Sequence, residues 1–120
     1  MTVAVNWFEI PVTNMGRAVE FYGAVLNTPL DTMDGPDGHM HVFPGADGAA
    51  GTLIQADDSI SSGGVLIYLH TDDIDAALQR ATSAGGAVEQ EKTSIGPFGF
   101  IGRFRDTEGN SVALHTPSDM

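Results

Sequence analysis

The chain has 120 residues, a net charge of −11 and no cysteine. The length predicts a single domain over residues 1–120, and the absence of cysteine excludes disulfides, thiolate metal sites and thiol nucleophiles. Five Lys and Arg against sixteen Asp and Glu argue against a nucleic-acid partner, which needs clustered cations. No apolar run approaches the about 18 residues that span a membrane, so we expect a cytoplasmic protein with no membrane partner. We attribute the acidity to solubility or a salt-rich cytoplasm rather than to steering of a cationic ligand.

The first predicted strand covers residues 5–12 and has two different faces, because side chains alternate along a strand. The apolar face carries Phe8, Ile10 and Val12, and it suits packing under a helix. The opposite face combines Trp7 with Glu9. A carboxylate beside the only tryptophan is unusual for a core, so we interpret this face as the wall of a ligand cleft.

The rest of the first half is predicted as a helix followed by strands. Apolar residues at helical spacing predict a helix over about 14–26, with Thr13 and Asn14 as candidate N-caps and Asn27 closing it before Pro29. Glycine-rich and aspartate-rich segments predict turns. The turns are placed at 34–38 and 44–48, the strands at 39–43 and 51–55, and a polar linker at about 57–63.

The second half returns to the opening pattern. Residues 65–70 predict a strand, and Ile74, Ala77, Leu78 and Ala81 then recur at helical spacing. Thr71, Asp72 and Asp73 offer helix caps, and Gly85-Gly86 ends the helix. Further strands are predicted near 87–92, 98–105 and 111–116, with a turn at 106–110 between the last two.

The two halves align as an internal repeat. The segment starting at Val12 matches the segment starting at Thr71, an offset of 71 − 12 = 59 residues. The segment starting at Phe43 matches the one starting at Phe104, an offset of 104 − 43 = 61 residues. We therefore predict an α+β fold of two strand-helix-strand-strand-strand modules, at about 3–57 and 64–117. Neither module can bury its sheet face alone, so a curved mixed sheet should enclose a shared cleft.

Two segments carry a family resemblance. The run from Phe8 to Tyr22 resembles the strand-helix opening of the vicinal oxygen chelate superfamily, which includes glyoxalase I, bleomycin-resistance proteins and extradiol dioxygenases. The run from Phe104 to His115 resembles its closing hairpin, and the opening is similar to a short bacterial glyoxalase-like group. The resemblance implies the same two-module fold, a small-molecule ligand and a homodimer. It does not imply one chemistry, because one fold hosts many activities.

The resemblance also implies where a divalent metal would be held. The usual ligand positions correspond to Trp7, Leu66, Ala113 and a fourth position near Gly51 or Thr52. Indole, isobutyl and methyl groups cannot coordinate Zn, Mg or Mn, so we expect no cofactor at the usual site. A shifted metal site is the alternative. Its ligands would be Glu9, His70 and His115, with Tyr68 on the same strand face as the lost ligands.

Several side chains are candidates for the ligand site. We predict ligand contacts from Trp7, Glu9, Tyr68, His70, His115, Phe98 and Phe100. Glu9 is the candidate catalytic residue, either as a general base or as an anionic contact, and the alternative is a purely structural carboxylate. For the two histidines we favour rim side chains bonded to backbone or water.

Other candidates have a structural alternative that we weigh beside the functional one. The glycine-rich loop 95–100 could lay an aromatic ring over a pocket, or Phe98 and Phe100 could pack in the core. His39 and His41 share a strand face, and we favour a surface strand over a metal site there. Arg103 and Arg105 also share a face; one could clamp a ligand carboxylate, although solvated edge charges are the interpretation we favour.

These observations favour a small-molecule binding protein of the glyoxalase and bleomycin-resistance type, with the ligand in the sheet cleft and without the usual metal. A glyoxalase-type lyase or isomerase that uses Glu9 as base, or a shifted metal, is the alternative. A structural or regulatory protein that has lost catalysis is the third hypothesis.

Overall fold

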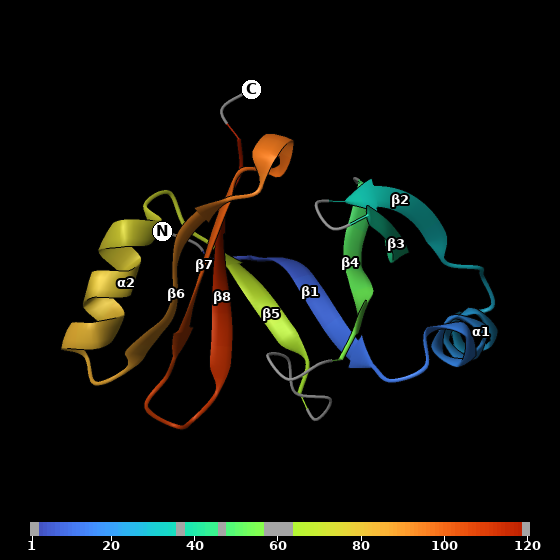
Figure 1. The fold of residues 1–120 in the computed structure, drawn as a ribbon, viewed down its shortest axis with the longest axis horizontal. Coiled ribbons are helices and arrows are strands. Elements are labelled where there is room, and N and C mark those ends of the chain that lie inside the picture. The colour runs from blue at the N-terminus through green and yellow to red at the C-terminus, as the bar shows by residue number, and fades with distance from the viewer. Residues whose placement is uncertain (1–2, 36–37, 46–47, 57–63, 119–120) are drawn as a thin grey trace. The chain divides into compact units, whose positions relative to one another are not determined.

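The chain forms two compact units in the computed structural model, which describes residues 3–35, 38–45, 48–56 and 64–118 (Figure 1). The first unit comprises residues 7–65, and the second comprises residues 1–6 together with 66–120. The predicted linker at about 57–63 lies outside the described residues. The predicted module bounds and the shared cleft stay predictions.

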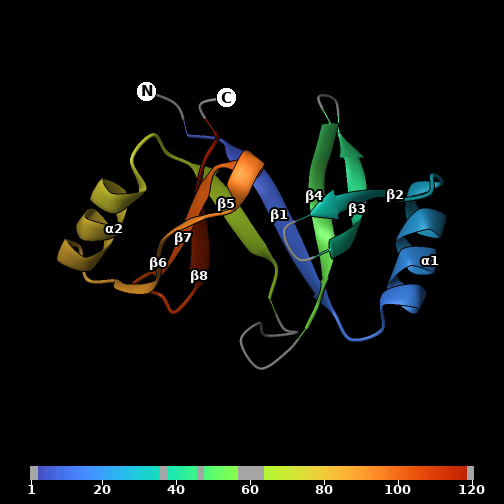
Figure 2. The ribbon, with the colours of Figure 1, turned by 45° about the horizontal axis from the view of Figure 1, so that its top comes forward.

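The first unit is a mixed sheet with one long helix beside it (Figure 2). Its elements are β1 (Val5–Val12, from Trp7 onward in this unit), α1 (Met15–Leu26), β2 (Asp31–Gly35), β3 (Gly38–Gly45) and β4 (Gly48–Gln55). The strand order is β2-β3-β4-β1. β1 runs parallel to β4, with Phe8 opposite Gly51, whereas β3 is antiparallel to both of its neighbours.

The core of the first unit confirms the predicted apolar face of β1. Leu30, Phe43 and Leu53 are buried, and partly buried apolar side chains of β1 and α1 pack against them. These side chains are Phe8, Ile10, Val12, Met15, Ala18, Val19 and Tyr22. Of the two candidate N-caps of α1, Asn14 is the one used, and the predicted C-terminal cap Asn27 is confirmed. The Asn14 side chain accepts a hydrogen bond from the Arg17 backbone N–H, and Asn27 adopts a left-handed conformation with φ 54°.

The second unit repeats this plan around its own core. Its elements are β5 (Leu66–His70), α2 (Ile74–Ser83), β6 (Ala87–Ser94), the 3₁₀ helix η1 (Gly96–Phe98), β7 (Phe100–Arg105) and β8 (Ser111–Thr116). The strand order is β5-β8-β7-β6, with β5 and β8 parallel and the other pairs antiparallel. Asp73 caps α2 by accepting from the Ala76 backbone N–H. Ile74, Leu78 and Leu114 form the buried centre of this unit.

The α+β class and the internal repeat are therefore confirmed, but some element bounds were wrong. β2 was not predicted, because it is a polar strand held to β3 by backbone pairing from Asp31 to Gly35 rather than by apolar side chains. The turns placed at 34–38 and 44–48 are too long. Strand pairing continues to Gly35 and resumes at Gly38 in the first case, and it continues to Gly45 and resumes at Gly48 in the second. β7 begins at Phe100, because residues 96–98 form a 3₁₀ turn. Within the described ranges, no helix has the length and hydrophobicity needed to cross a membrane.

Candidate functional site

The sheet of the second unit has one face toward α2 and one away from it. Leu69, Leu114, Val88 and Phe104 pack with Ile74 and Leu78 of the helix. Side chains alternate along strands, so the intervening residues project from the opposite face, which we call the distal face. It carries Tyr68, His70, Arg103, Arg105, Ser111, Ala113 and His115. The predicted common face of Tyr68, His70 and His115 follows from this register.

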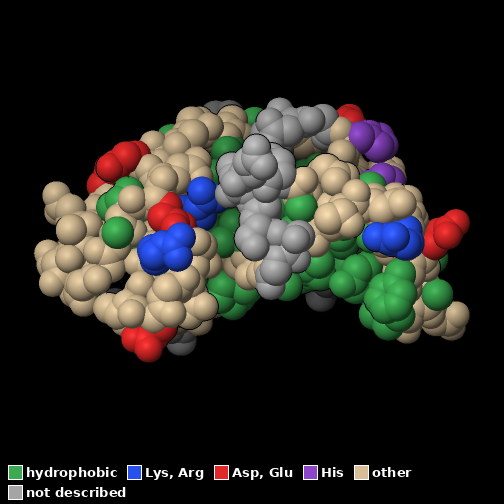
Figure 3. Space-filling model, turned by 60° about the horizontal axis from the view of Figure 1, so that its bottom comes forward, with side chains coloured by type: hydrophobic (Ala, Val, Ile, Leu, Met, Phe, Trp, Pro, Cys, Tyr) green, Lys and Arg blue, Asp and Glu red, His purple; other side chains and the backbone are tan. Residues whose placement is uncertain are grey.

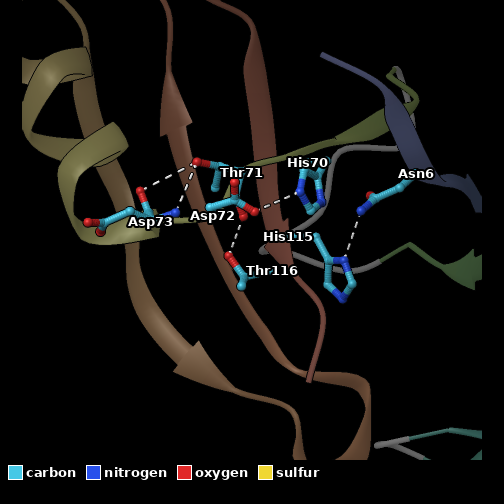
Figure 4. Close-up of polar contacts among 7 residues, drawn as sticks. All are labelled: Asn6, His70, Thr71, Asp72, Asp73, His115 and Thr116. Carbon is cyan, nitrogen blue, oxygen red and sulfur yellow. Dashed lines mark hydrogen bonds and ion pairs between the residues drawn. The ribbon is translucent and has the colours of Figure 1, made fainter. Parts of the chain in front are cut away.

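His115 has partners on both ring nitrogens, and Figure 4 shows the one from Asn6. Its Nε2 lies 2.7 Å from the Phe98 carbonyl oxygen, which can only accept, so Nε2 carries the proton. Its Nδ1 lies 2.9 Å from the Asn6 side-chain amide nitrogen, which donates to it. Through these contacts the ring joins β8, η1 and the start of β1. This is the backbone-bonded histidine that we favoured from the sequence.

His70 stands directly beside His115, because the two residues are paired in the parallel β5–β8 register. Its Nε2 lies 3.1 Å from Asp72 Oδ1, and Figure 4 shows both rings projecting from neighbouring strands. The His70 side chain is 37% exposed and that of Asp72 is 97% exposed. Because more than a third of the His70 side chain is exposed, it remains accessible to a ligand.

A second row of residues crosses the distal face next to the histidines. Tyr68 on β5 pairs with Ala113 on β8, and Ala113 pairs with Arg103 on β7. Tyr68 is 8% exposed and Ala113 is 2% exposed. The Tyr68 ring and the Arg103 guanidinium group thus lie on either side of the Ala113 methyl group. An aromatic ring near a charged hydrogen-bond donor is typical of small-molecule sites.

Glu89 is a distal-face residue that the sequence analysis missed. The β6–β7 register shifts between Val88 and Gln90, so Glu89 is the extra residue of a β-bulge, which redirects its side chain. Its Oε2 lies 2.8 Å from Arg105 Nη2 and its Oε1 lies 3.4 Å from Arg103 Nε. The Ser111 hydroxyl donates to the same Oε1 at 2.7 Å. Alternation from Val88, which faces α2, puts Glu89 on the distal face, but no local pattern shows which side chains of β7 and β8 lie beside it.

Trp7 and Glu9 are neighbours in the first unit, as their shared strand face predicts. The indole Nε1 donates to Glu9 Oε2 at 3.3 Å, and both side chains are half-buried. Glu9 pairs with Thr52 on β4. Thr52 is fully buried, and its hydroxyl donates to the carbonyl oxygens of His41 and Leu53 at 2.9 and 3.0 Å. The polar groups of Trp7 and Thr52 therefore form hydrogen bonds within the protein.

The side chains at the family's metal positions do not fit a divalent cation. Trp7 offers an N–H donor, Leu66 and Ala113 offer hydrocarbon, and the Thr52 hydroxyl already bonds two carbonyls. In the shifted set, His115 has no ring nitrogen left over and His70 faces Asp72. Among the residues that the structure describes, no group of three or more His, Cys, Asp and Glu side chains could hold a metal ion.

The remaining candidates lie away from the distal-face rows. Phe100 packs against the buried centre of the second unit, which is the core alternative for this ring. Phe98 is 36% exposed in η1, and its carbonyl oxygen is the partner of His115. His39 and His41 have ring centroids 6.3 Å apart, and the exposed His39 pairs with Asp34 at 3.3 Å. This matches a surface strand.

Surface grooves flank α1 in the first unit, away from every predicted site residue. The larger, of about 480 Å³, follows the end of β1 and the first turns of the helix. The other, of about 430 Å³, follows the end of the helix and the segment after it. Their walls carry Arg17 and Glu20 as the charged side chains. We do not assign the site to these grooves, because they hold neither paired acid–base groups nor a cluster of convergent polar groups.

Residues 4–114 match the model of the Glyoxalase/Bleomycin resistance protein/Dioxygenase superfamily. The chain belongs to this superfamily. The resemblance drawn from the opening strand and the closing hairpin is thereby confirmed. No curated protein matches the chain.

Solved structures share the fold at low sequence identity. A hypothetical protein from Bacillus halodurans is 12% identical with a TM-score of 0.73, covering 100% of this chain and 98% of that chain. A methylmalonyl-CoA epimerase from Streptomyces coelicolor is 20% identical with a TM-score of 0.63, covering 95% and 96%. A protein described as an NAD-dependent benzaldehyde dehydrogenase from Legionella pneumophila is 14% identical with a TM-score of 0.64, covering 93% and 98%. Neighbours with such different descriptions identify the fold and not the activity.

Proposed function

We propose that this chain is a small-molecule binding protein of the glyoxalase and bleomycin-resistance type that works without the superfamily's usual divalent metal. The observation that carries the proposal is the chemistry of the metal positions. Trp7, Leu66 and Ala113 have no donor atom for a cation, and the Thr52 hydroxyl is bonded to main-chain carbonyls.

The distal face supports a ligand contact in place of the metal. It offers the aromatic ring of Tyr68, the accessible imidazole of His70 and the guanidinium group of Arg103 within neighbouring strands. Rigid strands hold these groups, and His115 is locked by its two hydrogen bonds. Preorganised polar groups on a sheet are better suited to binding than mobile loop residues.

Metal analysis together with a thermal-shift screen tests this proposal. We expect purified protein to carry no stoichiometric divalent metal, and we expect chelator treatment to leave ligand-induced shifts unchanged. The screen uses defined sets of carboxylates, amines, sugars and thiol conjugates. His70→Ala should reduce the shift from any compound that binds the distal face. His39→Ala, on β3 of the first unit, is the matched control and should leave it unchanged.

Two results would contradict the proposal. One is a stoichiometric metal whose removal abolishes the ligand-induced shift. The other is a set of compounds that raises the melting temperature of His70→Ala and of the wild-type protein equally but does not raise that of His39→Ala. That result would place the ligand site in the first unit.

A lyase or isomerase is the second candidate function, and the Trp7–Glu9 contact favours it. The indole N–H of Trp7 donates to one carboxylate oxygen of Glu9 at 3.3 Å. This contact orients the carboxylate as a candidate base that removes a proton from the carbon next to a carbonyl group. The test is deuterium incorporation into methylmalonyl-CoA in deuterated water, because epimerases of this substrate share the fold. If Glu9 is the base, Glu9→Gln abolishes incorporation; if the wild-type protein incorporates none, this reaction is excluded.

We also propose that the chain forms a homodimer, as the superfamily resemblance implies, and that it is cytoplasmic, as its composition implies.

A further inference from the structure

The basic residues of this acidic chain are unevenly placed. The chain has five Lys and Arg at a net charge of −11, and Arg103 and Arg105 stand two positions apart on β7. Both project from the distal face, opposite Ala113 and Ser111 on β8. Neighbouring like charges repel each other, so this pair needs an anion near it.

Arg105 and Glu89 form an ion pair with each other. Arg105 Nη2 lies 2.8 Å from Glu89 Oε2, and Arg105 Nη1 donates to the Gly109 carbonyl oxygen at 2.9 Å. Glu89 also accepts from the Ser111 hydroxyl at 2.7 Å, and its side chain is only 18% exposed. This pair therefore fixes the bulge of β6 and the end of β7 in place.

Arg103 is left with incomplete pairing. Its Nε lies 3.4 Å from Glu89 Oε1, but this buried nitrogen has no acceptor in hydrogen-bond geometry. Its side chain is 26% exposed, and Nε is the guanidinium nitrogen that is both covered and without a hydrogen-bond acceptor. Leaving a buried donor without an acceptor is costly, and the planar guanidinium group has N–H groups arranged to match a planar anion.

We propose that Arg103 binds the carboxylate group of the small-molecule ligand. This inference rests on the proposed ligand-binding function and names the chemical class of the ligand. Two positive charges and one negative charge leave the Arg103–Arg105–Glu89 cluster with a single net positive charge. A monoanion neutralises that charge, whereas the nearby Glu89 carboxylate repels a phosphate dianion. The Tyr68 ring, on the far side of Ala113 in the same row, favours an organic carboxylate with an apolar body.

Benzoate, benzamide and phenyl phosphate are the probes that separate these ligand classes. Heteronuclear NMR of the arginine Nε–H groups follows each titration of the wild-type protein. Benzoate should move the Arg103 signal most, phenyl phosphate should bind more weakly, and neutral benzamide should leave the signal in place. Because the interaction is an ion pair, benzoate affinity should also fall with added salt.

Variants distinguish a binding role from a structural one. Arg103→Gln should weaken benzoate binding by about tenfold or more, because a charge-assisted bidentate contact is lost. Arg103→Lys keeps the charge without the fork and should lose part of the affinity. Glu89→Gln removes the competing carboxylate and should tighten benzoate binding. Arg80→Gln, which removes the same charge from α2, is the matched control and should have no effect.

Each contrary result has its own meaning. Unchanged benzoate affinity in Arg103→Lys and Glu89→Gln would overturn the inference, even if Arg103→Gln fails to fold. Tighter binding of phenyl phosphate than of benzoate would overturn the carboxylate assignment. If benzoate does not bind but a neutral compound gives a His70-dependent thermal shift, the proposed function stands and the Arg103 inference fails. If neither occurs and stoichiometric metal is present, the proposed function itself fails.

Discussion

The two helices occupy equivalent places in the repeat but differ in how they are packed. α2 buries Ile74 and Leu78, which are 1% and 3% exposed. α1, whose residues are all described, has no fully buried side chain. Its apolar residues Phe21, Val25 and Leu26 are 58%, 61% and 48% exposed, and Figure 3 shows hydrophobic side chains on the surface at the right, where Figure 1 places α1.

This difference shows that a repeated sequence pattern need not produce two equivalent cores. The second unit combines a buried helix with a tightly bonded distal face, including the Glu89 cluster and the two partners of His115. A rigid core beneath a polar sheet face is the arrangement that holds functional groups in position. The first unit instead leaves apolar helix surface outside its core.

The largest expected effect on stability comes from shortening a buried side chain of α2. Leu78→Ala should lower the free energy of unfolding by about 2–5 kcal/mol, because it removes a side chain packed on Ile74 and Leu114. Val25→Ala makes a comparable truncation on α1 and should change it by less than about 0.5 kcal/mol, because Val25 is exposed. Urea unfolding followed by circular dichroism measures both. Equal losses in the two variants would show that α1 is as well buried as α2.

Two glycine substitutions test the same difference in packing by adding a methyl group instead of removing side-chain atoms. A Cβ at Gly102 would lie 2.8 Å from Ile74 Cγ2 and 3.3 Å from Leu78 Cδ1, so Gly102→Ala should cost about 1–3 kcal/mol by overpacking. A Cβ at Gly23 of α1 meets its nearest atom, the Thr28 carbonyl oxygen, at 3.6 Å. Gly23→Ala should therefore stabilise the protein by about 0.5–1 kcal/mol through helix propensity. Thermal and urea unfolding give the signs, and a stabilising Gly102→Ala would show that α2 can move away from the sheet.

Sequence periodicity was sufficient for the fold because the fold depends on local signals. Helix caps such as Asn14 and Asp73, and the alternation of β1, act within a few residues and are visible in one sequence. The internal repeat then gave the connectivity. β2 was missed because its pairing with β3 is made by backbone groups, which carry no side-chain pattern.

The candidate site was only partly predictable, because its contacts join distant residues. The shared face of Tyr68, His70 and His115 follows from strand parity and was predicted. The bond from Asn6 to His115 spans most of the chain, and no local pattern predicts it. Glu89 contacts two arginines that lie on a different strand, and no local pattern predicts which residues of that strand lie beside it. Roles for Trp7 and Glu9 as ligand contacts stay predictions.

The smallest expected effect concerns the turns that end the two equivalent hairpins. In the second unit, Asp106 Oδ1 accepts from the backbone N–H groups of Glu108 and Asn110 at 2.8 and 2.9 Å. By the offset of 61 residues, its counterpart in the first unit is Gly45, since 106 − 61 = 45, and glycine has no side chain to accept such bonds. The second hairpin therefore has a charged side-chain cap at the position where the first has none.

This cap makes a pH-dependent contribution that Asp106→Asn should remove. The backbone hydrogen bond from Asn110 holds the pKa of Asp106 below its ordinary value of 3.8. Desolvation, the next largest effect, opposes this shift, and further hydrogen bonds from the same turn support it. A lowered folded-state pKa means that the unfolded chain takes up the proton first. The stabilisation is thus complete above the ordinary pKa and is lost as the pH falls through the lower, folded-state value. The measurement is the difference in free energy of unfolding between the wild-type protein and Asp106→Asn, followed from pH values near neutrality into this acidic range. We expect the difference to be small, because the carboxyl group is exposed, and to shrink on acidification. If the difference grows instead, the asparagine amide holds the turn less well than the neutral acid does. The charge of Asp106 would then not be what stabilises the turn.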